Sequence, residues 1–338
     1  MTTVAVVGAT GAVGRTMLQV LEERKFRLDA LRLIASPRSA GSAFETIWGP
    51  VVVENLEEVD PTGVDVALFS AGAQRSKVFI PAFVETGAVV VDNSSAFRMD
   101  PSVPLVVVGV NDDAAASHRG VIANPNCTTM TLMMGVAPLH RAAGLRSMVA
   151  TSYQSVSGSG QRGIAELSRQ IDALGEDRVA LAQGGWSDPG SEVYARPIGW
   201  NVIPLAGSEV EAGYTDEELK LINEPRKILA IPELAVEPTC VRVPVMVGHS
   251  VAATLRFRRP LDVDEALEIL RQAPGIQVWT DQVPTPLDAA GQDDVLVGRV
   301  RGTAGEPGGI NLWTVGDNLR KGAALNAVQI AELVSESG

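Results

Sequence analysis

The sequence predicts a doubly wound α/β domain followed by an α+β domain that contains a mixed sheet. In the first half, short apolar runs alternate with stretches of helical periodicity, which indicates a parallel sheet covered on both faces. After residue 127 the runs become longer and richer in Thr and Val, with alternating polar residues, which is typical of a mixed or antiparallel sheet. A glycine pattern at the N-terminus adds the strand–turn–helix unit that opens many parallel sheets.

The expected elements follow in chain order. In the first half we expect strands at residues 4–8, 31–35, 64–70, 88–92 and 105–109, with helices at 13–24 and around 80–84. In the second half we expect a helix after residue 127, β-rich runs at 147–156 and 240–258, a loop-rich segment at 184–213 and a terminal helix at 318–335. We expect the terminal helix to return to the first domain, so the expected domains are 1–126 with 317–338, and 127–316.

The composition limits the class of protein. The chain has 338 residues, which is enough for one large or two ordinary domains, and its 46% hydrophobic content can fill their cores. A net charge of −12 argues against broad binding to a nucleic-acid backbone. No apolar stretch is long enough to span a bilayer and no basic signal region precedes the first strand, so we expect a cytoplasmic protein. The 2 cysteines form no disulfide framework, and the 3 scattered histidines lack metal-ligand spacing, so we expect no metal.

Cys127 carries the clearest chemistry in the sequence. It follows Asn-Pro-Asn at 124–126 and precedes an apolar run, so we expect the thiol at the N-terminus of a helix. The N–H groups and dipole of a first helical turn lower the pKa of a thiol and favour the thiolate, a good nucleophile toward acyl carbons. Together with a nucleotide-binding loop, this predicts formation or cleavage of a thioester with hydride transfer.

The N-terminal strand–turn–helix predicts that nucleotide-binding loop. Gly8, Gly11 and Gly14 have the spacing of a tight turn, a close approach to a pyrophosphate and a close helix–strand contact. The second strand ends in Ser-Pro-Arg-Ser at 36–39, where NAD enzymes usually carry an acid. Because two hydroxyls and a guanidinium suit a 2′-phosphate, we predict NADP, although Arg38 as an ordinary solvated charge stays open. Short-chain reductases share the glycine turn, but the sequence lacks their Tyr-x-x-x-Lys pair.

Several polar residues of the second half have both a structural and a functional interpretation. Thr215 and Glu218 have the signature of a capping box, so we expect a helix to begin there. Glu217 and Lys220 lie three apart on one face of that helix, and the sequence alone favours a solvated ion pair for them. Cys240 lacks a turn-to-helix context, and we expect it to be a buried, inert thiol.

Arg242 and His249 are separated by an odd offset in a β-rich run. Such an offset puts them on opposite faces of a regular strand, so the chain must turn or bulge at Pro244 or Gly248 if both reach one site. His249 can hold a proton near pH 7, whereas a hydrogen-bonded structural role stays open on the sequence alone.

Several longer motifs occur in order along nearly the whole chain. They are Gly8–Gly14, Asp92–Arg98, Asn124–Cys127, Tyr153–Gly158, Asn201–Pro204, Arg242–Val245 with Gly248–Ser250, and Asp317–Ala324. Together they resemble the bacterial aspartate-semialdehyde dehydrogenases. Ala123 stands where many members have Ser, a difference that affects no catalytic residue.

By this resemblance the enzyme would reduce L-aspartyl 4-phosphate with NADPH to L-aspartate 4-semialdehyde and phosphate. That reaction would serve the biosynthesis of lysine through diaminopimelate, threonine, methionine and isoleucine. The resemblance implies Cys127 as nucleophile, His249 as acid/base and Gln154 as the residue that orients the intermediate. It implies that Arg242 and Glu217 hold the amino-acid end of the substrate, and that the phosphate contacts Arg98, Asn126 and Lys220. These residue types suit the substrate. Its α-carboxylate and α-ammonium need a cation and an acid as partners, and its acyl phosphate needs cations.

The resemblance also implies a Rossmann-type NADP-binding domain, a second domain for catalysis and dimerisation, and a homodimer. The positions that would contact NADP are Gly8, Thr10, Gly11, Ala12, Val13, Ser36, Arg38, Ser39, Ser70, Ala71, Gly72, Asn93, Ser157, Gly158 and Asn318.

Other functions stay open at this point. An enzyme like N-acetyl-glutamyl-phosphate reductase uses similar chemistry, but its substrate has a blocked amine. The Cys-Thr-Thr run also resembles glyceraldehyde-3-phosphate dehydrogenase, although the preceding Asn-Pro-Asn does not. From a different class, a non-catalytic NADP-binding protein with a redox-sensing thiol would not need Arg242, Glu217 and Lys220.

Overall fold

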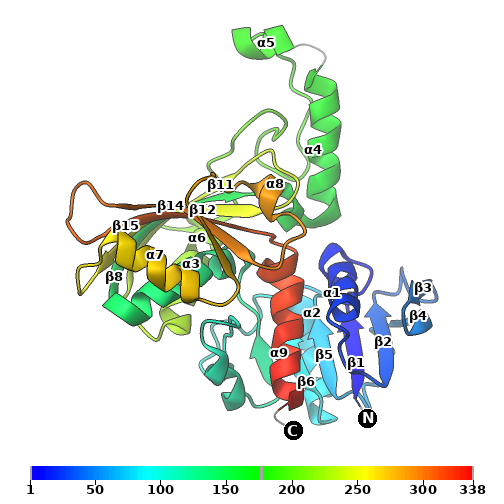
Figure 1. Ribbon diagram of the computed structural model, residues 1–338. Coiled ribbons are helices and arrows are strands. Elements are labelled where there is room, and N and C mark those ends of the chain that lie inside the picture. Colours follow the sequence, from blue (N-terminus) through cyan, green and yellow to red (C-terminus); the bar gives the residue numbers. More distant parts are fainter. Residues whose placement is uncertain (1, 176–177, 337–338) are drawn as a thin grey trace. The chain divides into compact units, whose positions relative to one another are not determined.

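The structure is a computed structural model that describes residues 2–175 and 178–336. Its contacts divide the chain into two compact units, which we describe separately (Figure 1). Unit 1 comprises Met1–Met133, Asn223–Pro232 and Leu319–Gly338, and unit 2 comprises Met134–Ile222 and Glu233–Asn318.

Unit 1 is built on a sheet of seven strands in the order β3-β4-β2-β1-β5-β6-β7. The neighbouring strands are parallel except β3 and β4, which pair antiparallel at one edge. The strands are β1 (Thr3–Val7), β2 (Ala30–Ala35), β3 (Ala43–Thr46), β4 (Gly49–Asn55), β5 (Val66–Phe69), β6 (Val89–Asp92) and β7 (Val121–Ala123). The predicted doubly wound parallel sheet is therefore confirmed.

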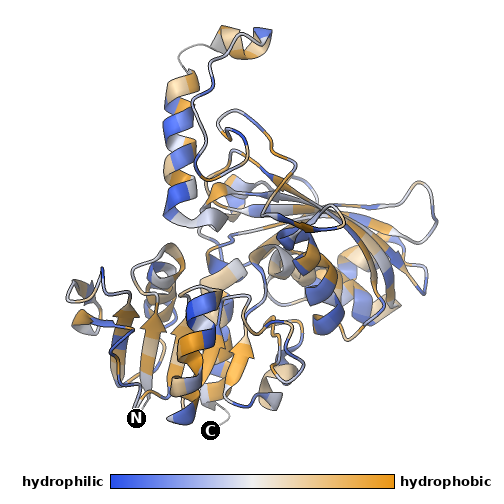
Figure 2. Cartoon of the chain, turned by 180° about the vertical axis from the view of Figure 1, so that it is seen from behind, coloured by the Kyte–Doolittle hydropathy of each residue, from blue (hydrophilic) through white to orange (hydrophobic). Residues whose placement is uncertain are grey.

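Helices cover both faces of this sheet. Val4 and Val6 of β1 pack in the core formed with α1 (Ala12–Glu23) and α9 (Leu325–Glu336), whereas Ala5 and Val7 pack in the core formed with α2 (Ala73–Glu85). Because side chains alternate along a strand, a continuous apolar run fills two cores at once. Figure 2 shows these strands in apolar colours and the helices in mixed colours. The terminal helix α9 packs in unit 1, as expected, after a π-helical turn at Arg320–Ala324.

Residues 105–109 do not form the expected strand. Leu105 pairs with Ala123 in an isolated bridge. The N–H of Val108 donates to the side-chain oxygen of Asn326 at 2.9 Å, so it bonds to a side chain instead of to the backbone of a neighbouring strand. The run is apolar because it is buried, and a short buried run does not by itself distinguish a strand from a loop. A 3₁₀ helix (Asp112–Ser117) follows, and the short strands β3, β4 and β7 were not predicted.

Unit 2 is built on a mixed sheet of six strands in the order β11-β8-β12-β15-β14-β13. β11 runs parallel to β8 and β13 parallel to β14, whereas β12 pairs antiparallel with both β8 and β15. The strands are β8 (Leu145–Gln154), β11 (Ala235–Arg242), β12 (His249–Phe257), β13 (Ile276–Trp279), β14 (Val295–Gly302) and β15 (Ile310–Gly316). A small separate ladder joins β9 (Glu209–Glu211) and β10 (Tyr214–Thr215). The predicted mixed sheet is confirmed.

The expected β-rich run at 240–258 consists of two strands with a turn between them. β11 ends at Arg242 and β12 begins at His249, and the two strands lie on opposite sides of β8. Gly248 in the turn has a φ of +98°, a left-handed conformation that favours glycine. Arg242 is in register with Gln154 at the end of β8, and His249 begins β12 beside the same end.

The remaining helices complete the two units. Helices α3 (Cys127–Ala143) and α6 (Asp216–Ile228) contribute residues to both units. Unit 2 also contains a 3₁₀ turn (Val156–Ser159), α4 (Gly160–Gly175), α5 (Arg178–Gln183), α7 (Val263–Gln272) and α8 (Pro286–Ala289). The predicted capping box begins α6, because Thr215 N donates to Glu218 at 2.8 Å and Glu218 N donates to Thr215 Oγ1 at 3.2 Å.

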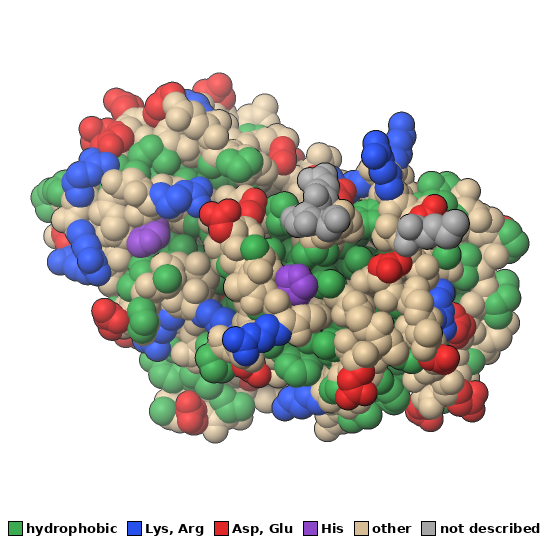
Figure 3. Space-filling model, turned by 90° about the horizontal axis from the view of Figure 1, so that it is seen from below, with side chains coloured by type: hydrophobic (Ala, Val, Ile, Leu, Met, Phe, Trp, Pro, Cys, Tyr) green, Lys and Arg blue, Asp and Glu red, His purple; other side chains and the backbone are tan. Residues whose placement is uncertain are grey.

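Neither a membrane-spanning helix nor a metal-ligand cluster occurs among the described residues. Within 2–175 and 178–336, no helix is long and apolar enough to cross a membrane. The same part of the chain contains no group of three or more His, Cys, Asp and Glu side chains that could hold a metal. On the face shown in Figure 3, acidic, basic and apolar side chains are interspersed.

Candidate active site

The predicted glycine turn joins β1 to α1 in unit 1. Gly8 has a φ of +88°, and a Cβ there would lie 2.3 Å from the carbonyl oxygen of Ser70. A Cβ at Gly14 would lie 2.2 Å from the carbonyl oxygen of Gly8. Glycine alone permits these approaches, which bring the turn against the end of β5. Gly11 is the N-cap of α1 and offers no side-chain cap, so the first N–H groups of the helix, from Ala12 onward, can bind an anion.

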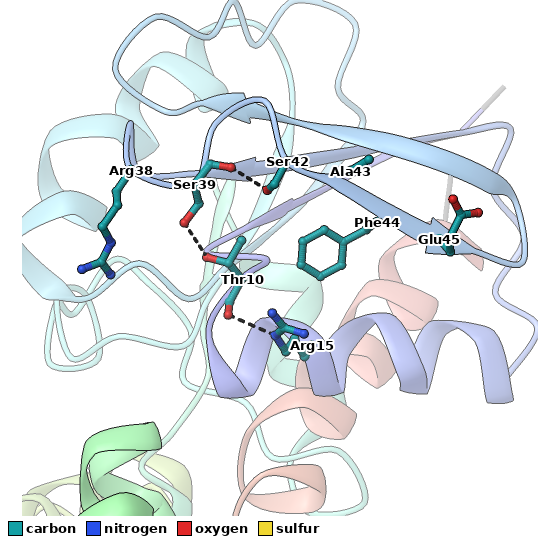
Figure 4. Close-up of a pocket in the computed structure, with 8 residues that line it drawn as sticks. All are labelled: Thr10, Arg15, Arg38, Ser39, Ser42, Ala43, Phe44 and Glu45. Carbon is teal, nitrogen blue, oxygen red and sulfur yellow. Dashed lines mark hydrogen bonds between the residues drawn. The ribbon is translucent and has the colours of Figure 1, made fainter.

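A pocket of about 560 Å³ opens beside this turn (Figure 4). Three predicted cofactor residues line it: Thr10, Arg38 and Ser39. The hydroxyl of Thr10 donates to that of Ser39 at 3.3 Å, which joins the glycine turn to the loop after β2. Ser36 is not among the lining residues, but its carbonyl oxygen accepts the N–H of Ser39 at 2.9 Å and so supports the loop.

Arg15 lines the same pocket and was not found from the sequence. Its Nε donates to the carbonyl oxygen of Thr10 at 3.2 Å, and its guanidinium carbon lies 5.0 Å from the centre of the Phe44 ring. Figure 4 shows Arg15 and Arg38 on opposite sides of Thr10, with the Glu45 carboxylate pointing away from both. The pocket therefore carries two guanidinium groups. Arg15 could have been predicted from the sequence, because it is a basic residue directly after the glycine motif. Its partner Phe44 could not, because it belongs to a strand that was not predicted.

Other predicted cofactor residues lie at neighbouring strand ends. Ser70, Ala71 and Gly72 follow β5, and Gly72 has a φ of +86° before α2 begins. Asn93 follows β6, and its side-chain oxygen accepts a hydrogen bond from the side chain of Asn124. The carboxyl ends of β1, β5 and β6 form one edge of the sheet, where ligands of doubly wound folds bind. Unit 1 thus brings its predicted cofactor residues together along this edge.

Cys127 is the first residue of α3, as predicted. The side-chain oxygen of Asn126 accepts the N–H of Thr128 at 2.9 Å and of Thr129 at 3.3 Å, so Asn126 caps the helix. The thiol therefore lies in the first turn, where the helix dipole favours its thiolate form. Burial raises the pKa of the Cys240 thiol to about 12, so Cys240 is the inert thiol that the sequence predicted.

Arg98 follows β6, and its guanidinium is buried against protein acceptors. Its Nε donates to the carbonyl oxygen of Asn124 at 2.9 Å, and its Nη2 donates to that of Asn93 at 2.8 Å. Its Nη1 donates to the carboxylate of Glu224 at 3.0 Å. Glu224 was not found from the sequence, because nothing there distinguishes it from a solvated acid on a helix.

Gln154, Glu217 and Lys220 gather at one end of β8 in unit 2. The side-chain amide of Gln154 donates to the carboxylate of Glu217 at 3.3 Å, and Lys220 donates to the other oxygen of Glu217 at 2.7 Å. The ion pair expected from the spacing exists, but it is half-buried rather than solvated, since the two side chains are 15% and 23% exposed. Burial lowers the pKa of the Lys220 ammonium, but the carboxylates of Glu217 and Asp216 outweigh it and raise the pKa overall.

Arg242 and His249 meet at the same end of β8, around Gly158. Arg242 Nη1 donates to the carbonyl oxygen of Ser155 at 2.7 Å, and His249 Nδ1 accepts the N–H of Ser155 at 3.0 Å. A Cβ at Gly158 would lie 3.2 Å from Arg242 Nη1 and 3.2 Å from His249 Nε2. The guanidinium carbon of Arg242 also lies 5.6 Å from the centre of the Tyr194 ring, which the sequence left unassigned in a loop.

The burial of His249 fixes its protonation state. Burial, and then the positive charge of Arg242, lower the pKa of His249 from 6.5 to about 3. The ring is therefore neutral near pH 7, whereas the ordinary pKa of 6.5 had led us to expect a histidine that exchanges a proton in that range. Because a backbone N–H donates to Nδ1, we assign the ring proton to Nε2. Seven buried side-chain atoms of the described residues lack a hydrogen-bond partner, and two of them, His249 Nε2 and Arg242 Nε, lie at this end of β8, where they are available to a ligand.

Asn318 organises the backbone and hydroxyl groups around this histidine. Its side-chain oxygen accepts the N–H of Gly248 at 2.9 Å, the hydroxyl of Ser155 at 3.0 Å and the hydroxyl of Ser157 at 3.1 Å. This ties the turn before His249 to the residues that follow β8. Ser157 and Asn318 had been predicted as cofactor contacts, whereas Ser155 had been missed.

The predicted site residues thus fall into two groups, each within one unit. Unit 1 holds the glycine turn, the two-arginine pocket, and Arg98, Asn126 and Cys127. Unit 2 holds the predicted catalytic, substrate and cofactor residues at the end of β8, which are Gln154, Ser157, Gly158, Glu217, Lys220, Arg242, His249 and Asn318.

Comparisons with known proteins agree with these features. The family model of the semialdehyde dehydrogenase NAD binding domain matches residues 3–118, and that of the semialdehyde dehydrogenase dimerisation domain matches residues 136–321. Aspartate-semialdehyde dehydrogenase from Streptomyces akiyoshiensis is 51% identical over 98% of both chains, and that from Mycolicibacterium smegmatis is 49% identical over 99% of both. The crystal structure of aspartate semialdehyde dehydrogenase II from Vibrio cholerae, 44% identical, covers 99% of this chain and 98% of its own with a TM-score of 0.93. The chain therefore belongs to the aspartate-semialdehyde dehydrogenase family.

Proposed function

We propose that this enzyme reduces L-aspartyl 4-phosphate to L-aspartate 4-semialdehyde with NADPH, through a thioester on Cys127. The observation that carries the proposal is the position of Cys127 as the first residue of α3, behind the Asn126 cap. A thiol in a first helical turn is activated as a nucleophile toward acyl carbons. The product would enter the biosynthesis of lysine, threonine, methionine and isoleucine.

The proposed reaction proceeds in two parts. The Cys127 thiolate attacks the acyl carbon, a C–S bond forms, and the C–O bond to phosphate breaks. Arg98, Asn126 and Lys220 would hold the departing phosphate. Bound NADPH supplies the hydride that reduces the thioester carbon. The resulting hemithioacetal anion then re-forms its carbonyl, the C–S bond breaks, and Cys127 returns to the thiolate.

The group at the end of β8 suits the amino-acid end of this substrate. Arg242 would bind the α-carboxylate and Glu217 the α-ammonium, while Gln154, hydrogen-bonded to Glu217 at 3.3 Å, would orient the acyl intermediate. The Vibrio cholerae structure described above is a complex with ASA, which supports a substrate of this class.

His249 would act through Nε2. This ring nitrogen faces Gly158, since a Cβ at that glycine would lie 3.2 Å from it. In the neutral ring this atom donates a hydrogen bond to the oxygen that becomes negative in the hemithioacetal. The charge of Arg242 contributes to the low pKa of His249. Burial is the larger cause of that low pKa, and a substrate carboxylate bound to Arg242 would offset only the second cause; the pKa of His249 would then rise on binding, which favours proton transfer through the ring.

The pocket beside the glycine turn suits NADP better than NAD. Arg15 and Arg38 provide two guanidinium groups for a 2′-phosphate, and Thr10 and Ser39 provide hydroxyls. A 25% identical relative from Candida albicans, with a TM-score of 0.73, was solved with NADP. The pyrophosphate would lie on the first turn of α1.

We also propose a homodimer formed through unit 2. The match to a dimerisation domain over residues 136–321 supports this. Sedimentation of the purified protein would test it, and a single species of monomer mass at assay concentrations would refute it.

The activity test is direct. Purified protein mixed with aspartate semialdehyde, phosphate and NADP should form NADPH, and Cys127→Ser should abolish turnover while it leaves NADP affinity near normal. Turnover retained by Cys127→Ser would refute the thioester. A preference for the N-acetyl-glutamyl compound would change the substrate, and NADP binding without turnover would favour a redox-sensing thiol.

Cofactor choice is tested on the two arginines. Arg38→Ala and Arg15→Ala should each raise the KM for NADP about ten- to hundred-fold, as expected for loss of a charge-assisted hydrogen bond. The KM for NAD should change little, because NAD lacks the 2′-phosphate. Equal effects on the two cofactors would remove that arginine from phosphate recognition.

A further inference from the structure

Glu224 on α6 is a buried carboxylate to which the reaction proposed above gives no role. It belongs to unit 1, and it is 1% exposed. One oxygen accepts from Arg98 Nη1 at 3.0 Å, and the other accepts the backbone N–H of Asn126 at 2.7 Å. A single carboxylate therefore joins the guanidinium assigned to the phosphate with the backbone that directly precedes Cys127.

The ion pair of Arg98 and Glu224 is shielded from solvent. Their side chains are 9% and 2% exposed. A buried carboxylate is costly unless a cation and further donors satisfy it, and here both oxygens are satisfied. Loss of one partner therefore leaves a buried charge or donor without compensation, so the geometry of the pair is tightly constrained.

Lys227, one turn further along α6, holds the other end of Arg98. Its ammonium donates to the carbonyl oxygens of Arg98 at 2.7 Å, Asp100 at 2.6 Å and Val103 at 2.7 Å. One face of the helix thus fixes both the main chain and the guanidinium of Arg98. A guanidinium has five N–H donors, and three acceptors for Arg98 occur among the described residues, so two N–H groups remain for a ligand.

We propose that Glu224 is a positioning residue for the phosphate step, because it aims the remaining donors of Arg98 and fixes the Asn126–Cys127 backbone at the same time. This inference rests on the proposed function, in which Arg98 binds the phosphate next to the thiol. Glu224 itself does not touch the substrate. It acts through Arg98 and through the start of α3.

The contacts of Glu224 select the variant that tests this role. In Glu224→Gln one oxygen becomes an NH₂ donor, which must face either Arg98 or the N–H of Asn126. Because both of these groups are donors, at least one contact is lost although the shape is conserved. Glu332→Gln is the matched control, since Glu332 pairs with Arg24 at 2.7 Å on a half-exposed surface of the same unit.

The first measurement is phosphate dependence in the oxidative direction, with aspartate semialdehyde and NADP saturating. Glu224→Gln should lower kcat/KM for phosphate about ten- to hundred-fold, while Glu332→Gln should match the wild type. The KM for NADP should not change in either variant. In an Arg98→Lys background Glu224→Gln should lower kcat/KM for phosphate by a smaller factor than in the wild type, because the contact with the Arg98 guanidinium is already lost and only the contact with the Asn126 N–H remains. An unchanged KM and kcat for phosphate in Glu224→Gln would overturn the proposal.

A second measurement does not need turnover. Iodoacetamide should alkylate Cys127, and inorganic phosphate should protect it in the wild type but require about tenfold higher concentrations in Glu224→Gln. If phosphate protects the wild type at lower concentrations than Glu224→Gln but the wild type has no dehydrogenase activity, the proposed function fails and the role of Glu224 stands. Equal protection of both proteins overturns the role of Glu224 whatever the activity. If Glu224→Gln does not fold, Lys227→Met is judged by the same two measurements.

Discussion

A methyl group added at Gly158 tests whether Arg242 and His249 form one site. In Gly158→Ala the new Cβ lies 3.2 Å from Arg242 Nη1 and 3.2 Å from His249 Nε2. Both contacts are shorter than an ordinary van der Waals separation, so both side chains must move by a few tenths of an ångström.

Neither side chain can move at no cost. Arg242 Nη1 is bonded to the carbonyl oxygen of Ser155 at 2.7 Å, and the buried ring of His249 accepts the N–H of the same residue at 3.0 Å. Overpacking of this kind costs about 1–3 kcal/mol. If that cost falls on the transition state, kcat/KM for the semialdehyde drops about 5- to 150-fold.

The assay compares Gly158→Ala with Gly305→Ala by steady-state kinetics and by urea unfolding. A Cβ at Gly305 meets no atom within 4 Å, so this control should keep wild-type kinetics and stability. The Gly158 variant should lose activity. It should also lose some stability if the buried ring of His249 has to move. Wild-type kinetics in Gly158→Ala would refute the assignment of Arg242 and His249 to one site at this glycine.

Three further outcomes follow from the buried groups. The pKa of His249 is about 3 in the folded protein and 6.5 when the ring is exposed, so the stability gained from the neutral buried ring is present above pH 6.5 and is lost as the pH falls toward 3. The unfolding free energy of His249→Asn should therefore depend on pH less steeply than that of the wild type, by up to about 1.4 kcal/mol per pH unit, in urea titrations. Because the pKa of Cys240 is raised to about 12, mass spectrometry after iodoacetamide at pH 8 should find one alkylated cysteine in the native wild type and none in Cys127→Ser. Glu218→Ala removes the acceptor of two buried N–H groups, those of Thr215 at 2.8 Å and Cys240 at 2.9 Å, and should lower the unfolding free energy by about 2–4 kcal/mol; a loss below the cost of an ordinary surface substitution would contradict this role.

The parts of the site that the sequence predicted are those with local signals. Gly8 and Gly14 are required by backbone approaches within one turn, and Cys127 begins α3 because the preceding Asn126 caps it. The capping box at Thr215 is also local. In each case the residue types and the structure they form lie within a few positions of each other, so a short pattern is sufficient.

The residues that escaped prediction depend on contacts between distant segments. Glu224 lies 126 positions from its partner Arg98, and Ser155, which was missed, lies 163 positions from its partner Asn318. Arg15 has a local hydrogen bond to Thr10, but its ring contact is with Phe44 of the unpredicted hairpin. The expected strand at 105–109 failed for the same reason, because the acceptor for Val108 is 218 positions away. Periodicity reports burial, but it does not report which distant polar group satisfies the backbone.

The protonation of His249 shows why residue type alone does not define a catalytic role. An exposed histidine titrates near pH 7, but burial and Arg242 lower the pKa of this one to about 3. Arg242 is also the residue proposed to bind the substrate carboxylate, so the substrate would offset the second cause of the low pKa, while burial, the larger cause, would remain. On this argument proton transfer at His249 depends on substrate binding. The pH dependence of kcat, which reports the bound enzyme, should therefore show a higher His249 pKa than that of kcat/KM, which reports the unbound enzyme. Identical profiles for the two parameters would mean that Arg242 does not couple substrate binding to the ring.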